Sequence, residues 1–118
     1  MQPDSLAFLQ DMLTQGERLS ELVAEQSLDN PTANWRTCAM LERLFFVIGE
    51  AATQLRKYDP ATAERITDLR EMIALRNRLA HAYQSINPQK LWDIARTNIP
   101  LLIHETTALI QEGESEHP

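Results

Sequence analysis

The chain has 118 residues, a formal net charge of −6 and a single cysteine. A chain of this length forms one domain that buries roughly two thirds of the surface its unfolded form exposes, so its core requires neither a structural metal nor a disulfide. It contains no run of about 18 apolar residues that could span a membrane, and its N-terminus lacks the basic segment of a signal peptide. We expect a cytoplasmic protein in which Cys38 is a buried, reduced thiol.

The charge is distributed unevenly along the chain. Residues 1–30 hold six acidic side chains and one arginine, and residues 97–118 hold four acidic side chains and no lysine or arginine. Residues 65–96, in contrast, hold six basic and three acidic side chains. Because phosphate binding needs local positive potential, this segment is where RNA would bind. A basic helix face is more often simply solvated, so the charge permits RNA binding without establishing it.

The first half of the chain predicts two long helices. Apolar residues recur at spacings of three and four from residue 4 or 5 to about residue 26, which indicates an amphipathic helix. Asn30 and Pro31 form a turn signal, and Thr32 is the expected N-cap of a second helix of about 25 residues that stops before "YDPAT". Its predicted inward stripe consists of Thr37, Leu41, Leu44, Ile48, Ala51 and Leu55.

The second half predicts a short helix and two longer helical segments. Asp59 followed by Pro60 has the pattern of an N-cap and a first helical residue, opening a short helix before the third long one, "TDLREMIALRNRLAHAY". A fourth segment runs from about Pro88 to residue 111, and Pro100 should kink or restart it. We therefore predict an all-α, up-and-down bundle of four main helices plus one short helix, with residues 1–112 as the helical domain and 113–118 as a polar tail.

Two aromatic residues of the second helix, Trp35 and Phe46, fall on the side opposite its apolar stripe. An exposed aromatic face is typical of a partner surface, for example that of a homodimer. Single exposed aromatic side chains are also ordinary, and each could pack against a neighbouring loop or helix. The sequence leaves both interpretations open.

An arginine interrupts the apolar face of the third helix. On a helical wheel Arg76 lies in the middle of the apolar positions, whereas His81 lies on nearly the opposite side. Burying a guanidinium without a partner is prohibitive, so Arg76 must either pair with an acid, for which Glu50 is the candidate, or face a wet cleft. If Arg76 and His81 cooperate, the helix must end or distort near Ala80, or the long arginine side chain must reach around it.

Three segments together resemble a known family. The octapeptide "RNRLAHAY" is similar to the R-x4-H-x-Y motif of HEPN-domain proteins, and more closely to that of the HepT toxins of HepT/MntA toxin–antitoxin pairs. The segment "AMLERLFFVIGEAATQL" resembles the second helix of that family with its "IGEA" signature, and "NPQKLWDIARTNIPLL" resembles the stretch after the motif. Arginine and histidine at this spacing are a weak signal alone, but the three segments in this order are much stronger.

The resemblance implies an all-helical homodimer in which two motif helices meet at a cleft, acting as a metal-independent endoribonuclease toxin without a cofactor. It implies RNA as substrate and a MntA-like nucleotidyltransferase as partner, which adenylylates the motif tyrosine, Tyr83. Arg76 and His81 are then the catalytic pair, and Asn77 is the polar residue that commonly follows the arginine. Arg78 occupies a variable motif position, and we assign it only a contact with an RNA phosphate.

These residue types suit RNA cleavage. Histidine titrates near neutral pH, so His81 can accept or donate a proton, and the planar cation of Arg76 can hold two phosphoryl oxygens at once. Asn77 precedes His81 by one helical turn and could orient the imidazole ring or the phosphate. Taken alone, His81 would more often be a capping or solvated histidine. The alternative function is a noncatalytic helical adaptor or nucleotide-binding subunit of a nucleotidyltransferase.

Overall fold

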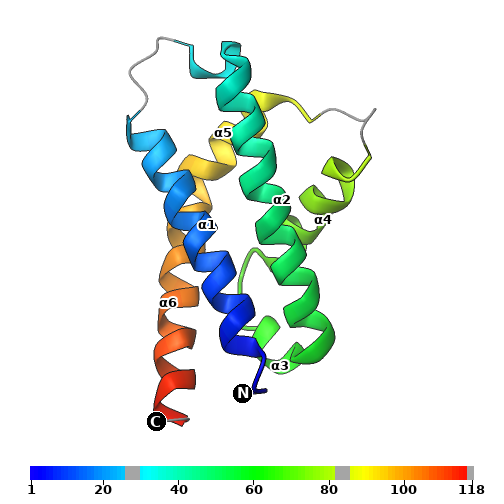
Figure 1. The fold of residues 1–118 in the computed structure, drawn as a ribbon, viewed down its shortest axis with the longest axis vertical. Coiled ribbons are helices and arrows are strands. Elements are labelled where there is room, and N and C mark those ends of the chain that lie inside the picture. The colour runs from blue at the N-terminus through cyan, green and yellow to red at the C-terminus, as the bar shows by residue number, and fades with distance from the viewer. Residues whose placement is uncertain (26–29, 82–85, 117–118) are drawn as a thin grey trace.

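The computed structural model describes residues 1–25, 30–81 and 86–116, and all the regular structure in these ranges is helical (Figure 1). The predicted all-α fold is therefore confirmed. The elements are α1 (Ser5–Glu25), the 3₁₀ turn η1 (Pro31–Ala33), α2 (Trp35–Tyr58), α3 (Pro60–Ala63), α4 (Leu69–Leu79), α5 (Pro88–Thr97) and α6 (Ile99–Glu116). None of these helices is long and apolar enough to cross a lipid bilayer.

The long helices run up and down along the 45 Å axis of the molecule. Helix α1 packs between α2 and α6, and α4 packs against the opposite side of α2 (Figure 1). Helices α5 and α6 together form the fourth helical segment of the bundle. Helix α5 ends at Thr97, and the chain restarts as α6 with Pro100 in its first turn. The predicted effect of Pro100 is confirmed. The C-terminal end of α4 lies on the far side of α2 from α6.

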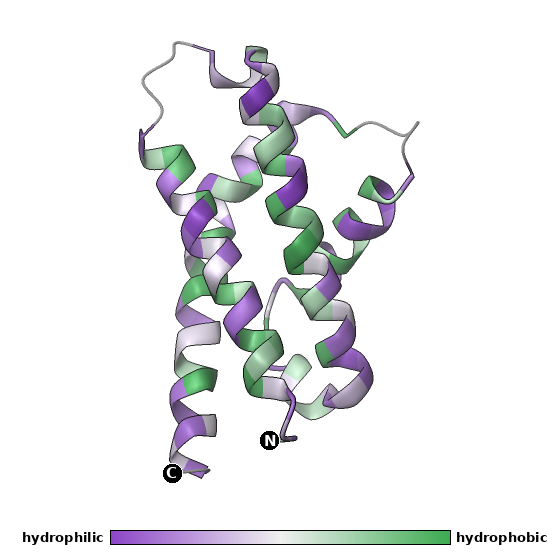
Figure 2. Ribbon diagram, viewed as in Figure 1, coloured by the Kyte–Doolittle hydropathy of each residue, from purple (hydrophilic) through white to green (hydrophobic). Residues whose placement is uncertain are grey.

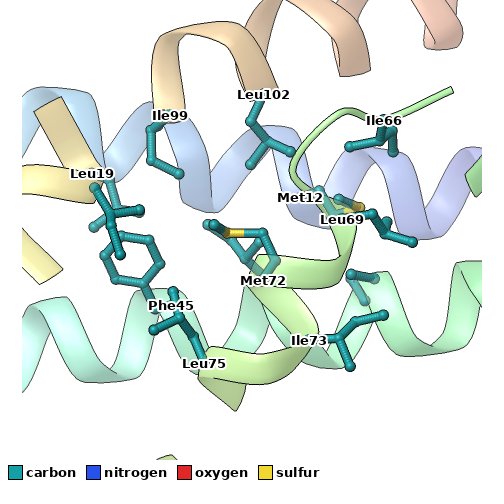
Figure 3. Packing of buried hydrophobic residues seen from close by; sticks show 14 of the residues in the cluster. Met12, Leu19, Phe45, Ile66, Leu69, Met72, Ile73, Leu75, Ile99 and Leu102 are labelled. Atoms are coloured by element: carbon teal, nitrogen blue, oxygen red, sulfur yellow. The ribbon is translucent and has the colours of Figure 1, made fainter. Parts of the chain in front are cut away.

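The buried side chains of α1, α2, α4 and α6 meet in one core, and Figure 3 shows this packing around Met72. Along each long helix hydrophobic residues recur at about every third or fourth position, with hydrophilic residues between them, as the sequence periodicity predicts (Figure 2). The predicted stripe of α2 is buried except at Leu44, which is half-buried. Leu44 is half-exposed because it lines a groove of about 460 Å³ between α1 and α2.

The start of α2 differs from the sequence prediction in two respects. Thr32 is not the N-cap: Pro31 opens the turn η1, and Asn34 caps α2 by accepting hydrogen bonds from the backbone N–H groups of Arg36 (2.9 Å) and Thr37 (3.3 Å). Asn34 has the extended backbone conformation that an N-cap requires. Cys38 is half-buried and not fully buried as expected, and its thiol donates to the Thr32 carbonyl of this turn (3.2 Å).

Asp59 joins three segments at the other end of α2. As predicted, it is the N-cap of α3, accepting from the backbone N–H of Thr62 (3.3 Å), and it also accepts from the hydroxyls of Thr62 (2.7 Å) and Ser5 (2.6 Å) and the backbone N–H of Gln2 (3.1 Å). Burial alone would raise the pKa of this carboxyl group, but the hydrogen bonds outweigh burial and lower the pKa to about 2.

The predicted polar tail from residue 113 continues α6 as far as Glu116. Gly113 is buried, packed so closely against Leu6 and Met1 that a Cβ atom there would come within 2.8 Å of either side chain. The N-terminal ammonium group also donates to the carboxylate of Glu116 (3.1 Å). The N-terminal residues thus hold the last turns of α6 in helical conformation, a long-range contact that the polar composition of this segment did not reveal.

Candidate active site

The motif lies at the C-terminal end of α4. Arg76, Asn77 and Arg78 belong to the last turn of this helix, and His81 follows its end. The N–H of Ala80 donates to the carbonyl of Arg76 (2.9 Å), the last bond with α-helical spacing within residues 69–81, where the description of this segment ends. The N–H of His81 donates to the carbonyl of Arg78 (3.2 Å), so the backbone tightens to a spacing of three residues. The helix therefore ends near Ala80, the geometry that cooperation between Arg76 and His81 requires.

Arg76 is fixed by side chains of α2 and α4. Its Nε donates to the carboxylate of Glu50 on α2, and its Nη1 donates to Oδ1 of Asn77 (3.1 Å). The guanidinium carbon also lies 5.6 Å from the centre of the Phe46 ring. Arg76 lies on the apolar face of its helix and was expected to need an acidic partner. That partner is Glu50.

The pair between Arg76 and Glu50 is not deeply buried. The Arg76 side chain is 32% exposed and that of Glu50 is 41% exposed. An ion pair with this much contact with water adds little to stability, so its main effect is on the direction of the guanidinium group. Arg76 therefore both forms an ion pair with an acid and lies at a surface in contact with water.

Gly49, next to Glu50 in the "IGEA" segment, allows α4 to approach α2 closely. A Cβ atom at this position would lie 2.2 Å from Cβ of Arg76 and 2.7 Å from the carbonyl oxygen of Met72. The sequence reasoning identified Glu50 but not Gly49. The available signal was a glycine inside a long helix, where it costs about 1 kcal/mol relative to alanine and so invites a packing reason.

The two aromatic residues of α2 have different environments. Phe46 is half-buried and lies under the guanidinium of Arg76, which agrees with local packing. Trp35 is 69% exposed, and the guanidinium carbon of Arg36 lies 4.8 Å from the centre of its ring. Local packing thus accounts for Phe46, whereas Trp35 keeps the exposure expected of a contact surface.

The remaining motif residues lie on an open surface. Asn77, Arg78 and His81 are exposed. Tyr83, the predicted site of modification, lies outside the described residues. The groove between α1 and α2 includes none of the motif residues. Within the described ranges, no three His, Cys, Asp or Glu side chains lie close enough together to hold a metal ion. One chain therefore presents Asn77, Arg78 and His81 at its surface.

Comparison with known proteins agrees with this arrangement. The family model described as Ribonuclease HepT-like matches residues 12–109, a range that includes the motif and most of the bundle. A protein of Methanocaldococcus jannaschii named Putative RNase MJ0127 is 30% identical over 116 residues, which cover 97% of this chain and 95% of that protein. The chain belongs to the HepT-like family of HEPN-type ribonucleases.

Proposed function

We propose that this chain is the toxin of a toxin–antitoxin pair, a cytoplasmic endoribonuclease that cleaves RNA without a metal ion. The observation that carries the proposal is the end of α4, where an oriented Arg76 lies in the same turn as the exposed Asn77 and Arg78, and His81 follows that turn by two residues. A permanent cation, an amide and an imidazole are the groups that metal-independent attack on an RNA phosphate requires.

In the proposed reaction the 2′-hydroxyl attacks the adjacent phosphorus, forming the O2′–P bond as the P–O5′ bond breaks. His81 accepts the proton of the 2′-hydroxyl, and a protonated histidine supplies a proton to the departing O5′. Arg76 stabilises the charge that develops on the phosphoryl oxygens. The products are a 2′,3′-cyclic phosphate and a 5′-hydroxyl end.

The proposed active form is a homodimer built partly on α2 and α4. Two-fold symmetry would bring two motif ends to one cleft, so that one histidine serves as base and that of the second copy as acid. The open surface around the motif and the exposed Trp35 support this assembly. Sedimentation of the purified protein at micromolar concentration should show a dimer, and a monomer there would count against it.

The test of the activity is incubation of the purified protein with total RNA in the presence of EDTA. Cleavage products should carry 2′,3′-cyclic phosphates, and a His81→Ala variant should give none. Tight RNA binding without cleavage by the wild-type protein would instead support the noncatalytic adaptor or nucleotide-binding subunit.

The proposed antitoxin is a MntA-like nucleotidyltransferase that modifies Tyr83. The tyrosine oxygen would attack the α-phosphate of ATP and release pyrophosphate, leaving AMP two residues after His81. The added phosphate would compete with RNA for Arg76 and Arg78, and the nucleoside would fill the cleft.

Co-expression with such a partner tests this step. Growth should recover with the wild-type toxin, and mass spectrometry should find added AMP on the peptide containing "LAHAY". A Tyr83→Phe toxin should remain active and resist neutralisation. Full rescue of Tyr83→Phe with no nucleotide attached would show that the antitoxin works by steric masking.

A further inference from the structure

We propose that Gly49 and Glu50 of α2 are positioning residues for Arg76: the glycine sets the approach of α4, and the carboxylate directs the guanidinium group. This inference rests on the proposed function, because it concerns how Arg76 is presented to an RNA phosphate. Neither residue belongs to the motif itself.

The first step is the unusual contact at Gly49. The three glycines of the chain all lie in helices and are buried, but their surroundings differ. A Cβ atom at Gly16 would meet the side chain of Ile103 at 3.2 Å, and at Gly113 the nearest atoms are also side-chain atoms. At Gly49 it would overlap with Cβ of Arg76 at 2.2 Å and a backbone oxygen of α4 at 2.7 Å, neither of which can move without the helix.

The second step is the path of the arginine side chain. Because Cβ of Arg76 lies directly against Gly49, its side chain runs across α2 between Glu50 and Phe46, which are one helical turn apart. Glu50 takes Nε, and the Phe46 ring lies against the guanidinium group. Three points on one rigid helix therefore fix both the origin and the direction of this side chain.

The third step is what remains for a ligand. Nε is engaged by Glu50 and Nη1 by Asn77, so among the described residues Nη2 is the guanidinium nitrogen without a hydrogen bond. The Arg76 side chain is 32% exposed, so this nitrogen is the one left for an oxygen of a bound phosphate. A guanidinium held in this way loses little freedom when a phosphate binds, which favours stabilisation of the transition state.

The direct experiment compares Gly49→Ala with Gly16→Ala, the same substitution at another buried helical glycine. In Gly49→Ala α4 must move away from α2, and displacement of a catalytic group by about 1 Å can lower the rate on the order of 100-fold. We expect kcat on a defined RNA to fall about 10- to 100-fold with KM changed less than about threefold. Gly16→Ala should keep both values near those of the wild type.

A second readout does not depend on activity. The ¹⁵N–¹H resonance of Arg76 Nε, assigned by its loss in Arg76→Lys, reports the hydrogen bond to Glu50. It should shift or broaden in Gly49→Ala and in Glu50→Ala but not in Gly16→Ala. Glu50→Gln, which keeps an acceptor oxygen, should restore part of the kcat that Glu50→Ala loses. Because Glu50→Ala leaves the contact at Gly49 unchanged, it keeps the proposal testable if Gly49→Ala does not fold.

The outcomes separate this inference from the proposed function. A folded Gly49→Ala protein with the wild-type Nε resonance and wild-type kcat would overturn it, as would equal losses of kcat in Gly16→Ala and Gly49→Ala. A Glu50→Ala protein with unchanged kcat and resonance would also overturn it. If the wild type cleaves no RNA, the proposed function fails, while the resonance still decides whether Gly49 and Glu50 position Arg76.

Discussion

Two carboxylates of similar chemistry lie where α2 meets other segments: Asp59 at the junction with α3, and Glu50 at the junction with α4. Their burial and their partners differ. Asp59, after the last residue of α2, is 5% exposed and accepts hydrogen bonds from the neutral groups of Gln2, Ser5 and Thr62. Glu50, in the interior of α2, is half-exposed and pairs with the cation of Arg76. The first carboxylate ties the N-terminal residues and α3 to α2, so its loss should affect folding. The second contacts the guanidinium group of Arg76, which we propose to bind RNA phosphate, so we expect its loss to affect RNA cleavage. Burial and partner type thus separate a stabilising carboxylate from a positioning one.

The largest expected effect is on activity at the end of α4. Arg76→Ala and His81→Ala should each lower the rate of RNA cleavage by about 10²- to 10⁴-fold, since the proposed mechanism uses Arg76 to stabilise phosphoryl charge and His81 to transfer a proton. Helicity by circular dichroism should not change. Arg78→Ala is the matched control and should reduce the rate less than either. A folded His81→Ala protein that still cleaves RNA at the wild-type rate would remove the assignment of His81.

The next effect is on stability at the other junction. Asp59→Ala should lower the free energy of unfolding by about 2–3 kcal/mol, because it removes an N-cap and leaves the buried donors of Ser5 and Thr62 without their acceptor. Urea denaturation measures this change. The cleavage rate per folded molecule should stay the same. If fully folded Asp59→Ala protein cleaved RNA at a different rate from the wild type, Asp59 could not be assigned a role in stability alone, and its contrast with Glu50 would be lost.

The free energy of unfolding should also depend on pH through the Asp59 carboxylate. The pKa of Asp59 falls from 3.8 to about 2 on folding. This group therefore stabilises the protein by about 2 kcal/mol above pH 4, and that contribution is lost as the pH falls from 4 towards 2. Thermal melts across this range should show a steeper loss in the wild type than in Asp59→Asn. Parallel curves for the two proteins would contradict the assignment.

The smallest effect on stability is expected from the loss of Glu50. Removing it in Glu50→Ala should change the free energy of unfolding by less than about 1 kcal/mol, because its pair with Arg76 is partly exposed to water. The same denaturation experiment as for Asp59→Ala measures it. A loss as large as that of Asp59→Ala would show that the pair is chiefly structural and erase the difference between the two junctions.

Local sequence signals predicted most of the fold. The apolar periodicity gave the four helical segments, Asp59 and Pro60 marked the start of α3, and Pro100 marked the restart at α6. These features depend on residues close together in the chain. The pairing of Glu50 with Arg76 was also accessible, because an arginine on an apolar face needs an acid.

The features that the sequence did not reveal depend on distant contacts or on competition between neighbours. Asn34 replaced Thr32 as the cap because Pro31 first forms a 3₁₀ turn. The polar end of α6 is helical because the N-terminal residues pack on Gly113. The role of Gly49 became visible only when the distance between α2 and α4 was known.

The end of α4 also sets the electrostatic conditions for binding. The aligned peptide dipoles of a helix place about half a negative elementary charge at its C-terminus, so this end repels phosphates that an N-terminus would attract. Arg76 and Arg78 in the last turn must offset that repulsion with side-chain charge alone, and Glu50 cancels part of it. RNA affinity at this site should therefore decline only moderately with salt concentration, because the slope is set by the few phosphate contacts that Arg76 and Arg78 can make.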